Sequence, residues 1–112
     1  MPVKLKVNTY MDVAVVELRE KALDASNSEN FKKSMAETLA NFQKVIIDLS
    51  RVEFIDSSGC GALLSCLRQL GDRKGWLRLC GVQKNVLRLF ELVRMNRIID
   101  IFPTKEDAVK NF

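Results

Sequence analysis

The sequence predicts an α/β fold in which a small mixed β-sheet is flanked by α-helices. Apolar residues near the start, broken by Asp12, indicate two strands that form a hairpin, Val3–Tyr10 and Val13–Leu18. Further along, short apolar stretches predict three more strands, Val45–Leu49, Trp76–Cys80 and Ile98–Phe102. Segments with helical spacing lie between these strands. This alternation is typical of an α/β sandwich.

The first two helices are predicted from apolar residues that recur on one face. Ser26–Phe42 is expected to form a helix, and Ser26 and Glu29 have the spacing of a capping box. A second helix is expected to begin near Asp56 and to end at Gly71 as its C-terminal cap. Its expected buried face consists of Cys60, Leu63, Leu64, Leu67 and Leu70.

Two further helices are expected towards the end of the chain. Val82–Val93 carries apolar residues at helical spacing. Thr104, which follows the strand-ending Pro103, can cap a last helix whose first turn carries Glu106 and Asp107. With 112 residues and no linker or repeat, residues 1–112 are expected to form one domain with a single core.

The composition excludes several kinds of catalytic site. The chain has no histidine, which excludes Ser-His-Asp and Cys-His catalysis. Its cysteines, Cys60, Cys66 and Cys80, form no Cys-x-x-Cys pair, so a zinc site lacks its usual spacing. We expect reduced, buried cysteines, no metal, no cofactor and no enzymatic activity.

Charge and hydropathy suggest neither direct nucleic-acid binding nor membrane insertion. The formal net charge is +4, but basic residues are spread from Lys4 to Lys110 with acids between them. This pattern is typical of a solvated surface. No stretch approaches the roughly 20 apolar residues that span a bilayer, and the start of the chain does not resemble a signal peptide. A cytoplasmic location is therefore expected.

The segment Phe54–Gly61, with sequence Phe-Ile-Asp-Ser-Ser-Gly-Cys-Gly, is the most informative part of the chain. It places two glycines in the first turns of a helix, where each costs about 1 kcal/mol relative to alanine, which suggests a close approach to the backbone. An ordinary helix N-cap is the alternative interpretation. A phosphate-binding loop and a nucleophile elbow both lack their required residues. Cys60 near a helix start could be reactive, although its place among leucines favours packing.

Two segments together, Val45–Ser50 and Phe54–Gly61, resemble the signature of STAS domains, most closely the bacterial anti-sigma factor antagonists. The resemblance covers essentially the whole chain. Leu23–Asn27 resembles an earlier loop of the family, and Leu79–Leu92 its later strand and helix. Cys60 departs from the pattern, because the family usually has a larger aliphatic residue there.

The resemblance implies a phosphorylation switch. Unphosphorylated antagonists of this family bind an anti-sigma factor that is also a serine kinase, and a serine phosphatase restores binding after phosphorylation. By position, Ser57 matches the phosphorylated serine, with Ser58 as second choice, and Asp56, Gly59 and Asp24 flank the site. The partner is expected to contact the exposed face of the second helix, namely Ser58, Gly61, Ala62, Ser65 and Arg68, with Gln69 beside them.

Two alternatives stay open from the sequence. The face with Arg68 can be simply solvent-exposed. The chain can also be a constitutive STAS subunit of a membrane-associated transport or stressosome-type assembly, in which Ser57 is only a helix cap. Phosphorylation at a helix start is physically plausible, because unpaired N–H groups and the helix dipole accommodate the negative charge without refolding.

Overall fold

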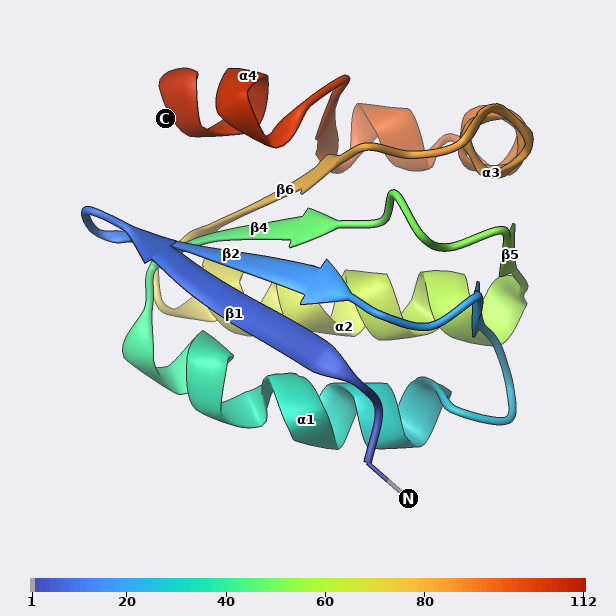
Figure 1. The fold of residues 1–112 in the computed structure, drawn as a ribbon, viewed down its shortest axis with the longest axis horizontal. Helices are drawn as coiled ribbons and strands as arrows, with labels where there is room; N and C mark the ends of the chain where they lie inside the picture. Colours follow the sequence, from blue (N-terminus) through green and yellow to red (C-terminus); the bar gives the residue numbers. More distant parts are fainter. Residues whose placement is uncertain (1) are drawn as a thin grey trace.

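The computed structural model describes residues 2–112, which form a sheet with helices on both sides (Figure 1). The strands are β1 (Leu5–Tyr10), β2 (Val13–Leu18), β3 (Ala22–Leu23), β4 (Lys44–Asp48), β5 (Phe54–Ile55), β6 (Trp76–Cys80) and β7 (Asp100–Phe102). The helices are α1 (Ser28–Asn41), α2 (Ser57–Asp72), α3 (Lys84–Leu92), the short 3-10 helix η1 (Met95–Arg97) and α4 (Lys105–Lys110).

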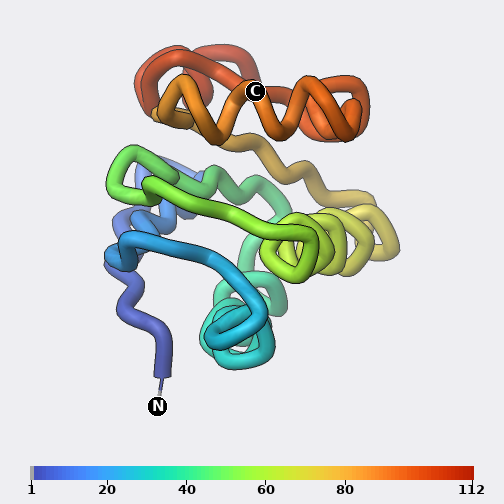
Figure 2. The backbone as a smooth tube through the Cα atoms, turned by 90° about the vertical axis from the view of Figure 1, so that its right-hand side faces the viewer, coloured from blue at the N-terminus to red at the C-terminus, as the bar shows by residue number. Residues whose placement is uncertain are grey.

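The main sheet has five strands in the order β1-β2-β4-β6-β7. Strand β1 runs antiparallel to β2, and the other neighbouring pairs are parallel. Helices α1 and α2 cover one face, while α3 and α4 lie on the other side (Figures 1 and 2). The predicted mixed sheet flanked by helices is therefore confirmed, including the hairpin at its start.

The buried residues form a large core, which includes Val86 and Phe90 of α3, and a small one. Strand β4 is buried on both faces, as its apolar sequence predicts: Val45 and Ile47 join the large core, and Ile46 joins the small one. The small core lies beneath α4 and consists of Val13, Val15, Ile46, Cys80 and Ala108. Among residues 2–112, no helix is both long and apolar enough to cross a membrane.

The expected capping box of the first helix is wrong. Helix α1 begins at Ser28, and its N-cap residue Asn27 makes no capping bond with its side chain. The hydroxyl of Ser26 instead donates to Oδ1 of Asp24 at 2.6 Å, and Asn27 Oδ1 accepts from the Asp24 amide at 2.9 Å. These local bonds close the loop before the helix, and Glu29 pairs with Lys32.

Helix ends and short strands show further differences from the expectation. Gly71 lies inside α2, which continues to Asp72, and Lys74 takes the left-handed conformation (φ 60°) beyond the C-cap Arg73. The last strand begins only at Asp100, because Ile98 and Ile99 form a turn after η1 in which both amides donate to the Met95 carbonyl. The two-residue strands β3 and β5 were not expected. The predicted cap of α4 is confirmed, since Thr104 Oγ1 accepts from the Asp107 amide at 3.1 Å.

The three cysteines are buried free thiols, as predicted. Burial raises the pKa of Cys66 to about 12, and burial with the nearby Asp48 carboxylate raises that of Cys80 to about 12. Burial also raises the pKa of Cys60, which excludes an activated thiolate at the start of α2.

We expect native Cys66 and Cys80 to resist alkylation by iodoacetamide at pH 8. A thiol with a pKa of about 12 is ionised in only about one molecule in ten thousand at that pH. The same protein in urea should be alkylated at all three cysteines within the same time. Mass spectrometry of peptides from both samples measures this difference, and equal labelling of Cys66 or Cys80 in the two samples would contradict it.

Candidate functional site

The short parallel pair of β3 and β5 is followed on both strands by an aspartate. Leu23 of β3 lies opposite Ile55 of β5 in this pair. The residue directly after each strand is an aspartate, Asp24 after β3 and Asp56 after β5. Since parallel strands advance in the same direction, both aspartates reach the same edge, where α2 begins. The structure thus brings together two of the predicted flanking residues.

Asp56 is the N-cap of α2. Its Oδ1 accepts from the Gly59 amide at 2.9 Å, and its Oδ2 accepts from the Ala25 amide at 3.1 Å. The carboxylate therefore ties the helix start to the loop after β3. The hydrogen bond from Gly59, followed by that from Ala25, lowers the pKa of Asp56, so the group stays ionised near neutral pH.

Gly59 allows the close contact between α2 and the loop after β3. A Cβ at this position would lie 2.1 Å from the Leu23 carbonyl oxygen and 2.8 Å from Cγ2 of Ile55. No side chain fits into that space. The close approach to the backbone that the two glycines suggested is therefore confirmed at Gly59. The group that approaches is the Leu23 carbonyl of the same chain. At Gly61 nothing lies within 4 Å of the same added atom.

Ser57 and Ser58 are both exposed at the first turn of α2. Ser57 is the first helical residue, and the cap is the neighbouring Asp56. The hydroxyl of Ser57 is therefore not needed to cap the helix. The expectation that Ser57 serves as the N-cap in a constitutive STAS subunit is therefore wrong in this one detail.

Asp24 stabilises the adjacent loop. Its Oδ1 accepts from both the amide and the hydroxyl of Ser26, at 2.9 and 2.6 Å. Its backbone carbonyl accepts from the amides of Asn27 and Ser28. Asp24 thus fixes the loop that binds Asp56 through Ala25. Among residues 2–112, no group of three or more potential ligands is placed to hold a metal ion.

The face of α2 that was expected to be exposed is only partly exposed. Ser58, Gly61 and Arg68 are exposed, and Ser65 is half-buried. Ala62 is buried, with 2% of its surface exposed, so its place on the contact face is wrong. The buried residues of α2 are the small Gly59, Cys60, Ala62 and Cys66 together with Leu63 and Leu70. Leu64 and Leu67, which were expected to be buried, are only half-buried.

The sequence interpretation missed Phe54 and Ala25. Phe54 is 54% exposed, three positions before Ser57, whereas its neighbour Ile55 is buried. Side chains of a strand point alternately to its two faces, and such an alternation would have predicted that Phe54 is exposed. Strand β5 has only two residues, so its sequence shows no alternation. Ala25 contributes only its backbone amide, which no side-chain pattern reveals.

Comparison with known proteins places this geometry in a family. The STAS domain family model matches residues 4–108. The anti-sigma F factor antagonist of Paenibacillus polymyxa is 24% identical, over 97% of this chain and 94% of the relative. A candidate anti-sigma factor antagonist of Bordetella bronchiseptica is 31% identical, over 77% of this chain and 78% of the relative.

Solved structures show the same fold. A candidate anti-sigma factor antagonist from Thermotoga maritima is 26% identical, with a TM-score of 0.86 over 96% of this chain and 92% of that one. The Bacillus protein SpoIIAA, solved unphosphorylated and phosphorylated, is 20% identical with a TM-score of 0.71. These structures cover 96% of this chain and 96% and 98% of SpoIIAA. The chain therefore belongs to the STAS domain family and is of the bacterial anti-sigma factor antagonist type.

Proposed function

We propose that this protein is a binding module switched by phosphorylation of Ser57. In the unphosphorylated state it binds an anti-sigma factor that is also a serine kinase, and a serine phosphatase reverses the modification. It acts in the cytoplasm and performs no catalysis itself. The observation that carries the proposal is the exposed Ser57 at the first position of α2, beside a carboxylate that already caps the helix.

The helix start can accept a phosphate without losing its cap. Both oxygens of the Asp56 carboxylate are held by backbone amides, from Gly59 and from Ala25. A phosphate on Ser57 does not have to displace either bond. Unpaired N–H groups of the first turn and the helix dipole favour negative charge there. The fold should therefore persist in both states.

The phosphate should act on the bound partner. It adds about −1.5 to −2 charges at neutral pH. Asp56 and Asp24 already place carboxylates at this edge of the molecule, so the modified site concentrates negative charge. A partner that covers Ser57 would have to remove water from all of these groups. Binding is therefore weakened at the contact surface.

The contact surface runs along the exposed side of α2. Gly61 leaves the helix backbone open, since nothing lies within 4 Å of a Cβ built there. Ser65 and Arg68 continue this side one and two turns further. Ser58 and the exposed ring of Phe54 flank Ser57 and extend the surface. Small residues near the serine let a partner's backbone approach closely.

In vitro phosphorylation by the cognate kinase tests the site. We expect a single phosphate on Ser57, mapped by mass spectrometry. Ser57→Ala should abolish labelling, whereas the matched control Ser58→Ala should be labelled as the parent is. Phosphate on Ser58 alone, or undiminished labelling of Ser57→Ala, would refute the assignment. If a partner binds equally whether or not Ser57 is phosphorylated, the constitutive-subunit role replaces the switch.

A further inference from the structure

A strip of the sheet beside α4 is left uncovered. Helix α4 has only six residues, and it packs over the small core through Ala108. Tyr10 on β1 lies opposite Val13 on β2, so both side chains are on this face of the sheet. Val13 is 4% exposed and Tyr10 is 42% exposed. The part of the sheet covered by α4 therefore ends between β2 and β1, and Tyr10 lies beyond it.

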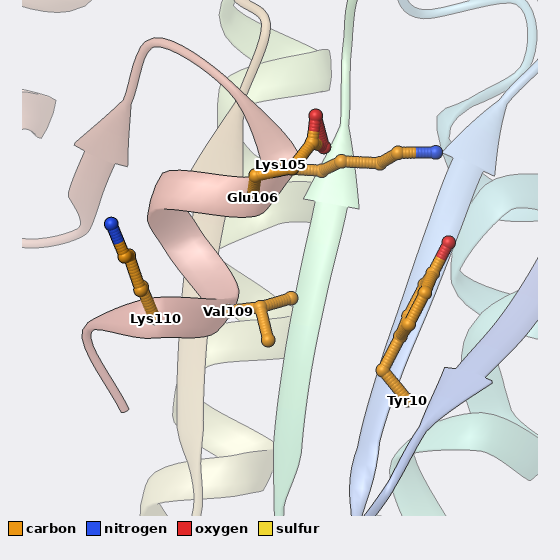
Figure 3. Close-up of a pocket in the computed structure, with 5 residues that line it drawn as sticks. All are labelled: Tyr10, Lys105, Glu106, Val109 and Lys110. Carbon is orange, nitrogen blue, oxygen red and sulfur yellow. The ribbon is translucent and has the colours of Figure 1, made fainter.

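A cavity of about 360 Å³ occupies this strip. It is lined by Tyr10, Lys105, Glu106, Val109 and Lys110. In Figure 3, the side chain of Val109 points from α4 into the gap, and the Tyr10 ring stands on the opposite side. The volume lies within the range of small-molecule pockets, roughly 300 to 1,000 Å³.

The polar groups of the cavity gather at one end. Figure 3 shows the Lys105 side chain reaching across the gap, so that its ammonium and the Tyr10 hydroxyl lie at the same end. The ammonium of Lys110 points away from Tyr10. The five ion pairs found among residues 2–112 involve neither lysine. Since no ion pair holds the Lys105 ammonium, it can bind an anion at the end of the cavity where the Tyr10 hydroxyl lies.

We propose that this cavity binds a small amphipathic carboxylate. Its apolar body lies between the Tyr10 ring and Val109, and its carboxylate accepts hydrogen bonds from the Lys105 ammonium and the Tyr10 hydroxyl. The apolar walls contribute most of the contact, and the charge–charge hydrogen bond fixes the orientation. An anion without an apolar body cannot fill the apolar walls. An alcohol of equal length carries no charge for the Lys105 ammonium to bind.

This site is separate from the proposed switch. Tyr10 ends β1 at the hairpin, whereas Ser57 begins α2 at the opposite end of the sheet (Figure 1). The two sites also lie on different faces, because α2 and α4 cover opposite sides. The cavity can therefore be tested without any partner protein, and its result does not depend on the role of Ser57.

Titration of the ¹⁵N-labelled protein with hexanoate, followed by NMR, tests the proposal. Hexanoate should shift the amides of Tyr10 and of α4 in a saturable manner. Hexan-1-ol, which has the same apolar body, and acetate, which has only the anion, should each bind at least about tenfold more weakly. The proposal is overturned if hexanoate does not saturate, if hexan-1-ol binds as tightly, or if the shifts lie elsewhere.

Matched variants locate the binding determinants. Lys105→Gln and Tyr10→Ala should each weaken hexanoate binding about tenfold. Lys110→Gln removes a charge that points away, and Trp76→Ala removes an aromatic ring that is 51% exposed in the same cross-strand row. Both controls should bind as the parent does. Equal losses in a variant and its control would overturn the proposed contacts, and thermal melts verify that all four are folded.

Discussion

Replacing Gly59 with alanine should destabilise the protein by about 3 kcal/mol or more, the upper range for forcing an atom into a packed core. The added Cβ would overlap the Leu23 carbonyl oxygen at 2.1 Å. That carbonyl belongs to a backbone held in the parallel pair of β3 and β5, so it cannot rotate away alone. Helix α2 would have to move off the loop, which breaks the bond from Ala25 to Asp56.

Gly61→Ala is the matched control for this substitution. It lies two positions further along the same helix, and nothing is within 4 Å of the added atom. Alanine has the higher helix propensity, so this variant should gain up to about 1 kcal/mol. Urea unfolding followed by circular dichroism measures both variants. Similar free energies of unfolding for the two would contradict the role of Gly59 as the point of closest approach.

Ser57→Asp should weaken binding to the kinase-type partner by about 150-fold, corresponding to about 3 kcal/mol, whereas Ser57→Ala should bind as the parent does. Aspartate places a fixed negative charge next to Asp56, and a bound partner would have to desolvate both. Alanine leaves the surface neutral. Because Asp56 forms the cap, neither variant removes a capping side chain.

Isothermal titration beside thermal melts separates a surface effect from a structural one. Both variants should melt close to the parent, and aspartate at the first helical position is even favoured by the helix dipole. Ser58→Asp is the matched control for charge at the neighbouring position. If Ser57→Ala loses binding as much as Ser57→Asp does, the hydroxyl itself is a structural contact and no charge switch operates there.

The sequence alone predicted the main sheet and its helices because each long element carries its own pattern of apolar residues. The buried run Val45–Leu49 and the alternating hairpin need no partner to be recognised. Strands β3 and β5 were not predicted, because a strand of two residues shows no period. Their pairing also joins segments that lie about thirty residues apart in the sequence. The capping box at Ser26 failed because Asp24, two positions earlier, binds the same hydroxyl.

The candidate site was predicted in its residue types but not in its packing. The Asp-Ser-Ser-Gly segment indicated the helix start, and Asp56 caps that helix. Ala62 was misplaced because the leucines were taken to define the buried face. The structure buries Gly59, Ala62 and Cys66 of this helix as well as Leu63 and Leu70, so the buried side is wider than the stripe of leucines. Helix α2 packs against α1 as well as against the sheet, and this arrangement is not visible in the sequence of one helix.

The affinity of the phosphorylated protein for its anti-sigma partner is the most direct test of the switch. The protein should be phosphorylated to completion by the cognate kinase, purified, and titrated against that partner beside the unphosphorylated form. We predict a loss of at least about 100-fold in affinity, with closely similar circular dichroism melts of the two forms. Equal affinities, or global unfolding of the phosphorylated form, would contradict a switch that acts at the contact surface of α2.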